Sequence, residues 1–108
     1  MIPQIAPAEL ARWRADASRG SPLLVDVREP WEFDYCRIDG SLSIPLGEVT
    51  RRQTELPRER ALVIVCHHGR RSQHAAMLLA GAGFENVHNL QGGVEAWAAE
   101  VEPTMKRY

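Results

Sequence analysis

The chain has 108 residues, of which 44% are hydrophobic and 25% charged, and its net charge is −1. This length allows one hydrophobic core, so we expect a single domain over residues 1–108, and the composition is that of an ordinary globular protein. The small net charge gives no overall field that would attract nucleic acid or a membrane surface, so we expect neither as a partner.

Strand and helix patterns alternate along the first half of the chain. In order, we expect a very short edge strand at 4–5, a helix at 7–13 with proline in its first turn, a buried strand at 22–27, a short helix at 28–35 and a third short strand at 42–46. Asp26 and Arg28 should leave the second strand on opposite sides and tie down the following loop with charge-assisted hydrogen bonds. We interpret both as scaffold that supports a site rather than as catalysts.

The second half contains the most apolar strand, Ala-Leu-Val-Ile-Val at 61–65. Its β-branched residues, without polar alternation, are typical of a strand buried on both faces of a parallel sheet. Around it we expect one solvated helix within 47–57, a helix at 73–80, a strand at 84–90, a helix at 94–100 and a tail at 101–108 that docks only in part. Strands that alternate with helices predict a parallel sheet covered by helices on both faces.

Cys66 directly follows this apolar strand and precedes a helix. The carboxyl ends of strands are where open α/β sheets bind ligands. Gly69 lets the connecting loop turn inward, and Ser72 is placed to cap the helix. The unpaired N–H groups of a helix start, together with the charges of Arg70 and Arg71, favour a thiolate over a thiol. We interpret Cys66 as a reactive nucleophile; the alternative is a structural cysteine at the end of a buried strand.

Four segments resemble a known family in their order and spacing. They are residues 24–33 (LVDVREPWEF), 38–46 (IDGSLSIPL), 66–72 (CHHGRRS) and 90–93 (LQGG), the last with Ala96 and Trp97. Together they are similar to a rhodanese (thiosulfate sulfurtransferase) domain, over nearly the whole chain. The resemblance implies an α/β fold with a five-stranded parallel sheet flanked by helices on both faces. It also implies a cysteine that carries a sulfane sulfur as a persulfide, without a cofactor.

The resemblance makes Cys66 the catalytic residue. It makes the rest of the loop a substrate-binding cradle formed by His67, His68, Gly69, Arg70, Arg71 and Ser72. Cys66 would attack the outer sulfur of a donor such as thiosulfate and pass it to cyanide, a thiol or a protein acceptor, which predicts ping-pong kinetics.

Side chains in this cradle have separate expected roles. We expect Arg70 and Arg71 to attract the anionic donor and to stabilise the departing sulfite, although each could instead be a solvated arginine at the loop edge. His67 and His68 should act through their backbone amides rather than their rings. The hydroxyl of Ser72 can reach the sulfur in addition to capping the helix.

One departure from the family pattern is a second cysteine. Cys36 and Arg37 stand where the family often has Gly-His. Cys36 is either a second thiol that resolves the persulfide on Cys66 or a small buried side chain, and we favour the buried, inert interpretation.

Three other interpretations compete with sulfur transfer by a free-standing enzyme. Dual-specificity phosphatases of the cell cycle share this fold and use a Cys-x5-Arg loop, but here the sixth residue after Cys66 is Ser72, and the shorter loop suits one sulfur better than a phosphate. A zinc site is not expected, because no Cys-x2-Cys or His-x3-His pair exists. A sulfur relay to a partner protein, or a regulatory binding module, stays open because a relay needs the same persulfide.

The two cysteines indicate a reducing compartment. Arg12, Arg14 and Asp16 interrupt any apolar signal segment near the start, and the longest uncharged run, 72–84, is far shorter than the ~18 residues that suggest a membrane span. We therefore expect a cytoplasmic protein with free thiols, although a cleaved signal peptide would leave no trace in this chain.

Overall fold

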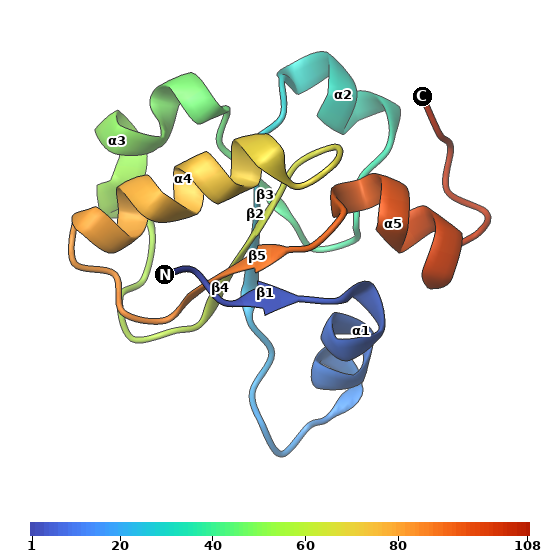
Figure 1. Ribbon diagram of the computed structural model, residues 1–108, viewed down its shortest axis with the longest axis horizontal. Coiled ribbons are helices and arrows are strands. Elements are labelled where there is room, and N and C mark those ends of the chain that lie inside the picture. The colour runs from blue at the N-terminus through green and yellow to red at the C-terminus, as the bar shows by residue number, and fades with distance from the viewer.

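Five short parallel strands form the centre of the computed structural model, which describes all of residues 1–108 (Figure 1). The strands are β1 (Gln4–Ile5), β2 (Leu23–Asp26), β3 (Leu42–Ser43), β4 (Leu62–Val65) and β5 (Val87–Leu90). Their order across the sheet is β1-β5-β4-β2-β3, and every neighbouring pair is parallel. The predicted five-stranded parallel sheet is therefore confirmed, with all carboxyl ends at one edge.

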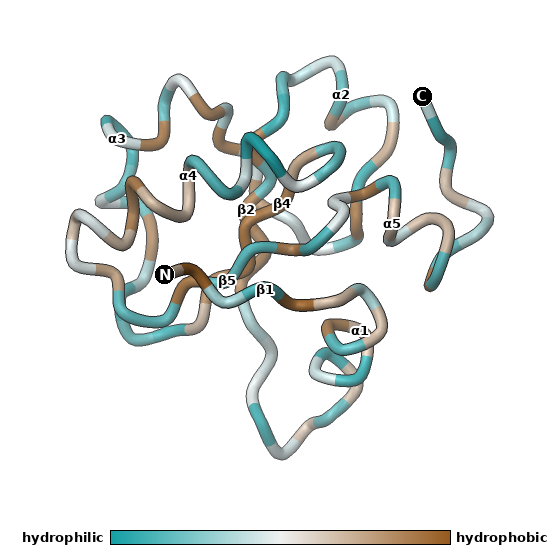
Figure 2. Tube along the Cα trace, in the orientation of Figure 1, coloured by the Kyte–Doolittle hydropathy of each residue, from teal (hydrophilic) through white to brown (hydrophobic).

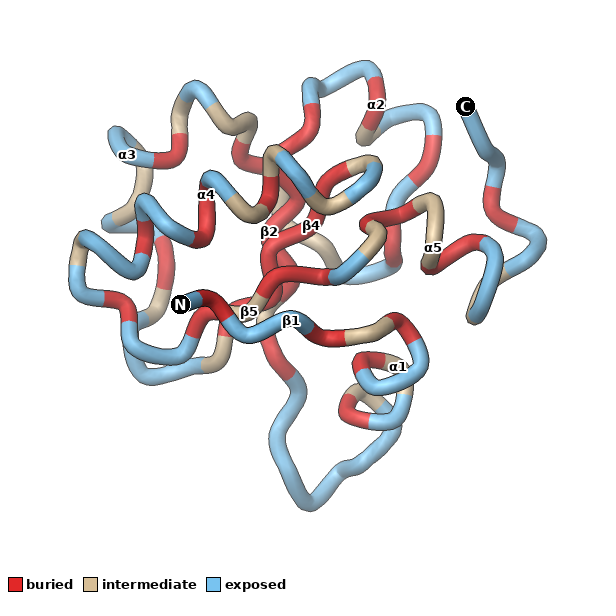
Figure 3. The backbone as a smooth tube through the Cα atoms, in the orientation of Figure 1, coloured by how far each residue is buried: buried red, intermediate tan, exposed pale blue.

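The apolar strand predicted at 61–65 lies in the middle of this sheet. In β4, all four residues are buried between β2 and β5. Leu62 and Ile64 face one hydrophobic core, whereas Val63 and Val65 face the other, because successive side chains of a strand alternate between its faces. Figure 2 shows β2 and β4 as hydrophobic stretches, and Figure 3 shows the same strands as buried.

Helices cover both faces of the sheet, as the sequence predicts. Leu10 of α1 (Pro7–Ala15) and Trp97 of α5 (Gly93–Glu100) belong to the core on one face. Leu79 of α4 (Arg70–Gly81) and Val49 of α3 (Val49–Arg52) belong to the core on the other face. The short helix α2 (Pro30–Tyr35) follows β2 and lies beside the loop that leads into α4 (Figure 1). No helix combines the length and the apolar character that crossing a membrane requires.

The polar stretch 47–57 differs from the single solvated helix that we predicted. It contains the four-residue α3 between two 3₁₀ turns, Leu46–Glu48 and Gln53–Glu55. Val49 and Leu56 are buried and belong to the core that covers α4. The segment is therefore held to the core by its few apolar residues, although its overall composition is polar.

The tail after α5 is also more closely packed than predicted. Met105 is buried in the core formed by α1 and α5, and the backbone N–H of Val101 continues the helix pattern by donating to the carbonyl of Trp97. From there the chain runs back toward α2, where residue 108 lies (Figure 1).

Candidate active site

The side chain of Cys66 lies at the carboxyl end of β4, where the sheet edge meets the start of α4. It is only 1% exposed. Its Sγ accepts a hydrogen bond from the backbone N–H of Gly69 at 3.0 Å and lies 3.2 Å from the hydroxyl oxygen of Ser72. Above it is an open pocket of about 270 Å³, lined by Cys66, His67, His68, Arg70 and Arg71. The structure thus brings together all seven residues that the sequence assigned to the loop.

The backbone of this loop is shaped for an anion. Gly69 has φ of +100°, a left-handed conformation that side-chain-bearing residues rarely adopt, and α4 begins at the next residue. The backbone N–H groups of His68, Arg70 and Arg71 have no acceptor within the protein, in contrast to that of Gly69. A helix start with unpaired N–H groups is a site that attracts negative charge. The loop can therefore stabilise a sulfur anion, a persulfide or an anionic donor.

Ser72 does not cap the helix, which corrects the prediction. Because Gly69 allows the chain to enter the helix early, Ser72 is already the third helical residue and has Gly69 as the cap. Its hydroxyl instead donates a short hydrogen bond to Oδ1 of Asn89 and faces Sγ of Cys66. The hydroxyl thus lies within reach of the sulfur, at 3.2 Å, as expected, but its shortest contact is the hydrogen bond to Asn89.

Asn89 is a site residue that the sequence analysis did not identify. It is a buried polar residue in β5, and its Nδ2 donates to the carbonyl of Gly69 at 3.1 Å and to Oε1 of Gln4 at 2.9 Å. It holds both the hydroxyl of Ser72 and the backbone of the glycine turn. The available signal was a polar side chain in an otherwise apolar strand, since buried amides need hydrogen-bond partners.

The first turn of α5 fixes the other half of the loop. The backbone N–H groups of Val94 and Glu95 donate to the carbonyls of Cys66 and His67, at 2.9 and 3.1 Å. This approach requires Gly93, because a Cβ there would lie 2.4 Å from both carbonyl oxygens. The glycines at 92–93 carried part of the family resemblance. Gly93 is required by this contact with the cysteine loop, whereas a Cβ at Gly92 would lie 2.5 Å from the Cβ of Ala96.

The two arginines of the loop have different surroundings. Arg71 donates two hydrogen bonds to the carboxylate of Glu32, at 2.7 and 2.9 Å, whereas Arg70 is exposed and has no hydrogen bond or ion pair within the protein. The side chain of Glu32 is 6% exposed, and the hydrogen bonds from Arg71 lower its pKa to about 2. Much of the charge of Arg71 is thus balanced by Glu32, and Arg70 is the unpaired cation of the pocket.

The two histidines stack on each other at the pocket wall. Their ring centroids are 3.9 Å apart, with an angle of 26° between the planes. Burial, and then the neighbouring His68, lower the pKa of His67, which favours its neutral form. Nε2 of His67 is buried without a hydrogen-bond partner and lies 3.8 Å from a carboxylate oxygen of Glu95.

Comparison with known proteins supplies the family. The sequence model of the rhodanese-like domain matches residues 6–100. The chain belongs to the rhodanese family. It is 39% identical to the probable adenylyltransferase/sulfurtransferase MoeZ of Mycobacterium tuberculosis, over 96% of this chain and 26% of that protein. It is 37% identical to a sulfurtransferase of Allochromatium vinosum, over 91% of this chain and 90% of that protein.

Solved structures agree with this assignment. The rhodanese-related protein of Thermoplasma volcanium superposes with a TM-score of 0.83 at 30% identity, over 94% of this chain and 95% of that one. Both of the relatives described above are named as sulfurtransferases. The chain spans only about a quarter of the length of MoeZ.

Asp26 and Arg28 of the rhodanese domain pair with each other rather than diverging. Arg28 Nη2 and Asp26 Oδ2 are 2.7 Å apart, and both side chains are fully buried. The prediction that they leave the strand on opposite sides was wrong, because residues two apart on an extended chain lie on the same side. Arg28 also donates to the carbonyls of Glu32 and Cys36, so the pair links the end of β2 to α2.

Cys36, the departure from the family pattern, lies at the end of α2. Its side chain is buried in the core that covers α1 and α5, and its Sγ is 3.7 Å from Nη1 of Arg28. Both Cys36 and Cys66 are free thiols. Cys36 does not line the pocket above Cys66.

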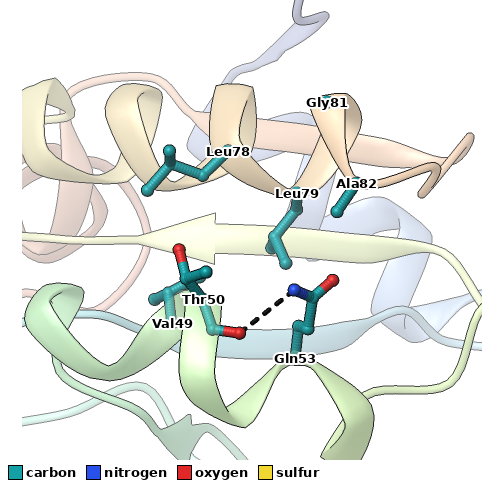
Figure 4. Close-up of a pocket in the computed structure, with 7 residues that line it drawn as sticks. All are labelled: Val49, Thr50, Gln53, Leu78, Leu79, Gly81 and Ala82. Carbon is teal, nitrogen blue, oxygen red and sulfur yellow. Dashed lines mark hydrogen bonds between the residues drawn. The ribbon is translucent and has the colours of Figure 1, made fainter.

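A second hollow, of about 210 Å³, lies between α3 and α4 (Figure 4). It is lined by Val49, Thr50, Gln53, Leu78, Leu79, Gly81 and Ala82. Its one internal polar contact is the hydrogen bond from Gln53 Nε2 to the carbonyl of Thr50. No ionisable side chain lines it, and no group of three or more His, Cys, Asp or Glu side chains in the protein could hold a metal ion.

Proposed function

We propose that this rhodanese domain transfers a sulfane sulfur through a persulfide on Cys66. The observation that carries the proposal is the position of Sγ, which lines a pocket and accepts a hydrogen bond from one N–H group, in a loop with three further N–H groups that have no acceptor. A sulfur anion in this place is stabilised by fixed peptide dipoles that need not reorganise during the reaction.

In the first half-reaction, the thiolate of Cys66 would attack the outer sulfur of a donor such as thiosulfate. The bond between the two donor sulfurs breaks, and sulfite leaves with the electron pair. The transferred sulfur keeps its negative charge as the terminal atom of the persulfide, where the loop N–H groups can receive it. Arg70 would attract the anionic donor to the pocket, since its charge is not balanced by a carboxylate.

In the second half-reaction, a thiolate or cyanide would attack the terminal sulfur of the persulfide. The new bond forms to the acceptor, and the electron pair of the sulfur–sulfur bond returns to Cys66 as a thiolate. Because the donor product leaves before the acceptor reacts, parallel lines are expected in double-reciprocal plots. No cofactor or metal takes part in this scheme, and we place it in a reducing cytoplasm, where two free thiols are stable.

The decisive experiment is intact mass spectrometry of the protein after incubation with thiosulfate. We expect one added sulfur, ~32 Da, that a reductant removes, and sulfite released in equal amount. Cys66→Ser should keep the fold and gain no mass, since it replaces one atom at a loop. Absence of the added sulfur on the native protein with thiosulfate and with an organic persulfide would exclude the proposal.

A second candidate function is a sulfur relay to a partner protein, and the size of a relative favours it. In MoeZ the matched region is a minor part of a longer protein. The persulfide is common to both functions, so the discriminating measurement is the acceptor: a relay would pass sulfur to a protein cysteine much faster than to cyanide or small thiols.

Phosphatase activity is disfavoured by the position of Arg71. Its guanidinium group is engaged by Glu32 through two hydrogen bonds, and the loop from Cys66 to Arg71 is one residue shorter than a Cys-x5-Arg loop. We expect no hydrolysis of an aryl phosphate above the rate of the Cys66→Ser variant.

A further inference from the structure

Residue Tyr108 reaches the cysteine loop from outside the region that matches the rhodanese model. That match ends at residue 100. The chain then runs from α5 back toward α2 (Figure 1), anchored by the buried side chain of Met105. The ring of Tyr108 makes edge-to-face contacts with two aromatic rings of α2, with centroid distances of 5.7 Å to Trp31 and 5.8 Å to Tyr35. These edge-to-face contacts hold the ring in one place.

The face of the Tyr108 ring lies on His67. The two rings are stacked, with centroids 3.9 Å apart and an angle of 15° between the planes. His68 stacks on His67 at the same centroid distance. Because Nε2 of His67 makes no hydrogen bond, ring contacts are the main restraint on this side chain. Tyr108 therefore limits the movement of the residue directly after Cys66.

The hydroxyl of Tyr108 makes hydrogen bonds with two charged residues, Arg28 and Glu32. It accepts a hydrogen bond from Nη1 of the buried Arg28 at 2.9 Å and donates one to Oε2 of Glu32 at 2.7 Å. The same carboxylate receives both hydrogen bonds from Arg71. Burial raises the pKa of Tyr108 to about 12, so the phenol keeps the proton that it donates. Tyr108 thus completes a chain of contacts from the Asp26–Arg28 pair to the guanidinium of Arg71.

We propose that Tyr108 is a positioning residue for sulfur transfer, holding the cysteine loop at His67 through its ring and at Arg71 through Glu32. The inference rests on the proposed function of Cys66. Tyr108 does not line the pocket, so it acts through these neighbours and not on the sulfur itself. Its two contacts predict separable effects: the ring sets the geometry of the loop, and the hydroxyl sets the position of the charged group at the pocket wall.

The test compares Tyr108→Ala and Tyr108→Phe with the native protein in two assays. One is steady-state transfer of sulfur from thiosulfate to cyanide; the other is alkylation of Cys66 by iodoacetamide, located by peptide mass mapping. For Tyr108→Ala we expect kcat and the alkylation rate to fall by about tenfold, because small displacements of a reacting group are costly. For Tyr108→Phe we expect near-native alkylation and a rise of about threefold in KM for thiosulfate, the effect of one hydrogen bond.

The matched control is Tyr35→Ala, which removes the only other tyrosine of the chain. Tyr35 is exposed and touches Tyr108 but not the cysteine loop. A purely structural role for Tyr108 would lower the melting temperature and leave the rates per folded molecule unchanged, or would affect Tyr108→Ala and Tyr35→Ala equally. Either outcome overturns the inference. Should Tyr108→Ala fail to fold, native KM and kcat in Tyr108→Phe overturn it.

Alkylation separates this inference from the proposed function. It needs no sulfur donor, so a native protein that forms no persulfide would refute sulfur transfer while the alkylation rates still report on the loop. Conversely, a persulfide formed at the native rate by Tyr108→Ala would leave the function of Cys66 intact and refute only the role of Tyr108.

Discussion

The surroundings of Cys66 and Cys36 differ although both side chains are buried free thiols, with 1% and 8% exposure. Cys66 sits among unpaired backbone N–H groups below an open pocket. Cys36 belongs to a hydrophobic core, and Arg28, whose Nη1 lies 3.7 Å from its sulfur, is also bonded to Asp26 and to backbone carbonyls. Burial of the residue therefore does not distinguish the surroundings of the two cysteines.

What separates them is the backbone around the sulfur. The glycine turn at Gly69 and the close approach of α5 at Gly93 place peptide N–H groups and an opening at Cys66. Cys36 follows a helix end in extended conformation, with φ of −159°, and has no such turn. Three substitutions test this difference, beginning with the one expected to have the largest effect.

Gly93→Ala should have the largest effect, a slower formation of the persulfide on Cys66. The new Cβ would lie 2.4 Å from the carbonyl oxygens of Cys66 and His67, and the φ of +60° disfavours alanine as well. We expect the rate of persulfide formation to fall by about 100-fold, because the loop must move away from α5. Rapid-quench mass spectrometry measures it. Gly81→Ala, where nothing lies within 4 Å of the new Cβ, is the control; equal rates in both variants would refute the packing argument.

Glu32→Gln should have an intermediate effect, on stability and on its pH dependence. Glu32 has a folded-state pKa of about 2, compared with an ordinary value of 4.5. A carboxylate with a depressed pKa stabilises the folded state fully above about pH 5, and this stabilisation is lost as the pH falls toward 2. At pH 7 we therefore expect the variant to lose about 2 kcal/mol of unfolding free energy, the magnitude of hydrogen bonds to a charged group, and the gap to the native protein to close in acid.

Urea unfolding at a series of pH values measures the effect of Glu32→Gln. The control is Glu55→Gln, which removes a carboxylate of the exposed pair with Arg52 and should change stability little. A stability gap for Glu32→Gln that stayed constant down to pH 2 would show that the charge of Glu32 is not responsible.

Cys36→Ser should have the smallest effect on sulfur transfer. Its Sγ does not line the pocket, so we expect kcat within about twofold of the native value and a loss of about 1 kcal/mol in stability from a hydroxyl placed in an apolar core. Paired steady-state kinetics and thermal unfolding check this. A variant as inactive as Cys66→Ser would instead establish a relay between two thiols.

Much of the fold could be predicted because its signals are local. The apolar run at 61–65 and the turn glycines fixed the strands and most helices within a few residues, since the period of the side chains reports directly on burial. The prediction for 47–57 was wrong because its two buried residues, Val49 and Leu56, are too few to produce a periodic hydrophobic pattern. The predicted start of the helix was wrong because serine is a good cap, whereas the left-handed conformation of Gly69 lets the helix begin earlier, at Arg70.

The candidate site was predictable only within one continuous segment. Cys66 and the residues up to Ser72 are adjacent in the sequence, so their chemistry could be interpreted together. Glu32, Asn89 and Tyr108 reach the same place from distant parts of the chain, and each makes its contact at a separation of 17 residues or more. No local pattern reports such a pairing, because it follows from the order of the strands and from packing.

The hydroxyl of Ser72 has one proton and two neighbours that can take it, the sulfur of Cys66 and the amide oxygen of Asn89. A neutral thiol can donate a hydrogen bond to the hydroxyl oxygen of Ser72, and the hydroxyl then donates its own hydrogen to Asn89. A thiolate has no hydrogen to donate, so the hydroxyl of Ser72 would donate to the sulfur and give up its hydrogen bond to the amide oxygen of Asn89. Rotation about the Cβ–Oγ bond of Ser72 thus switches the partner of its hydroxyl with the charge of the sulfur, and the 2.5 Å separation from Asn89 Oδ1 must lengthen when that hydrogen bond is lost.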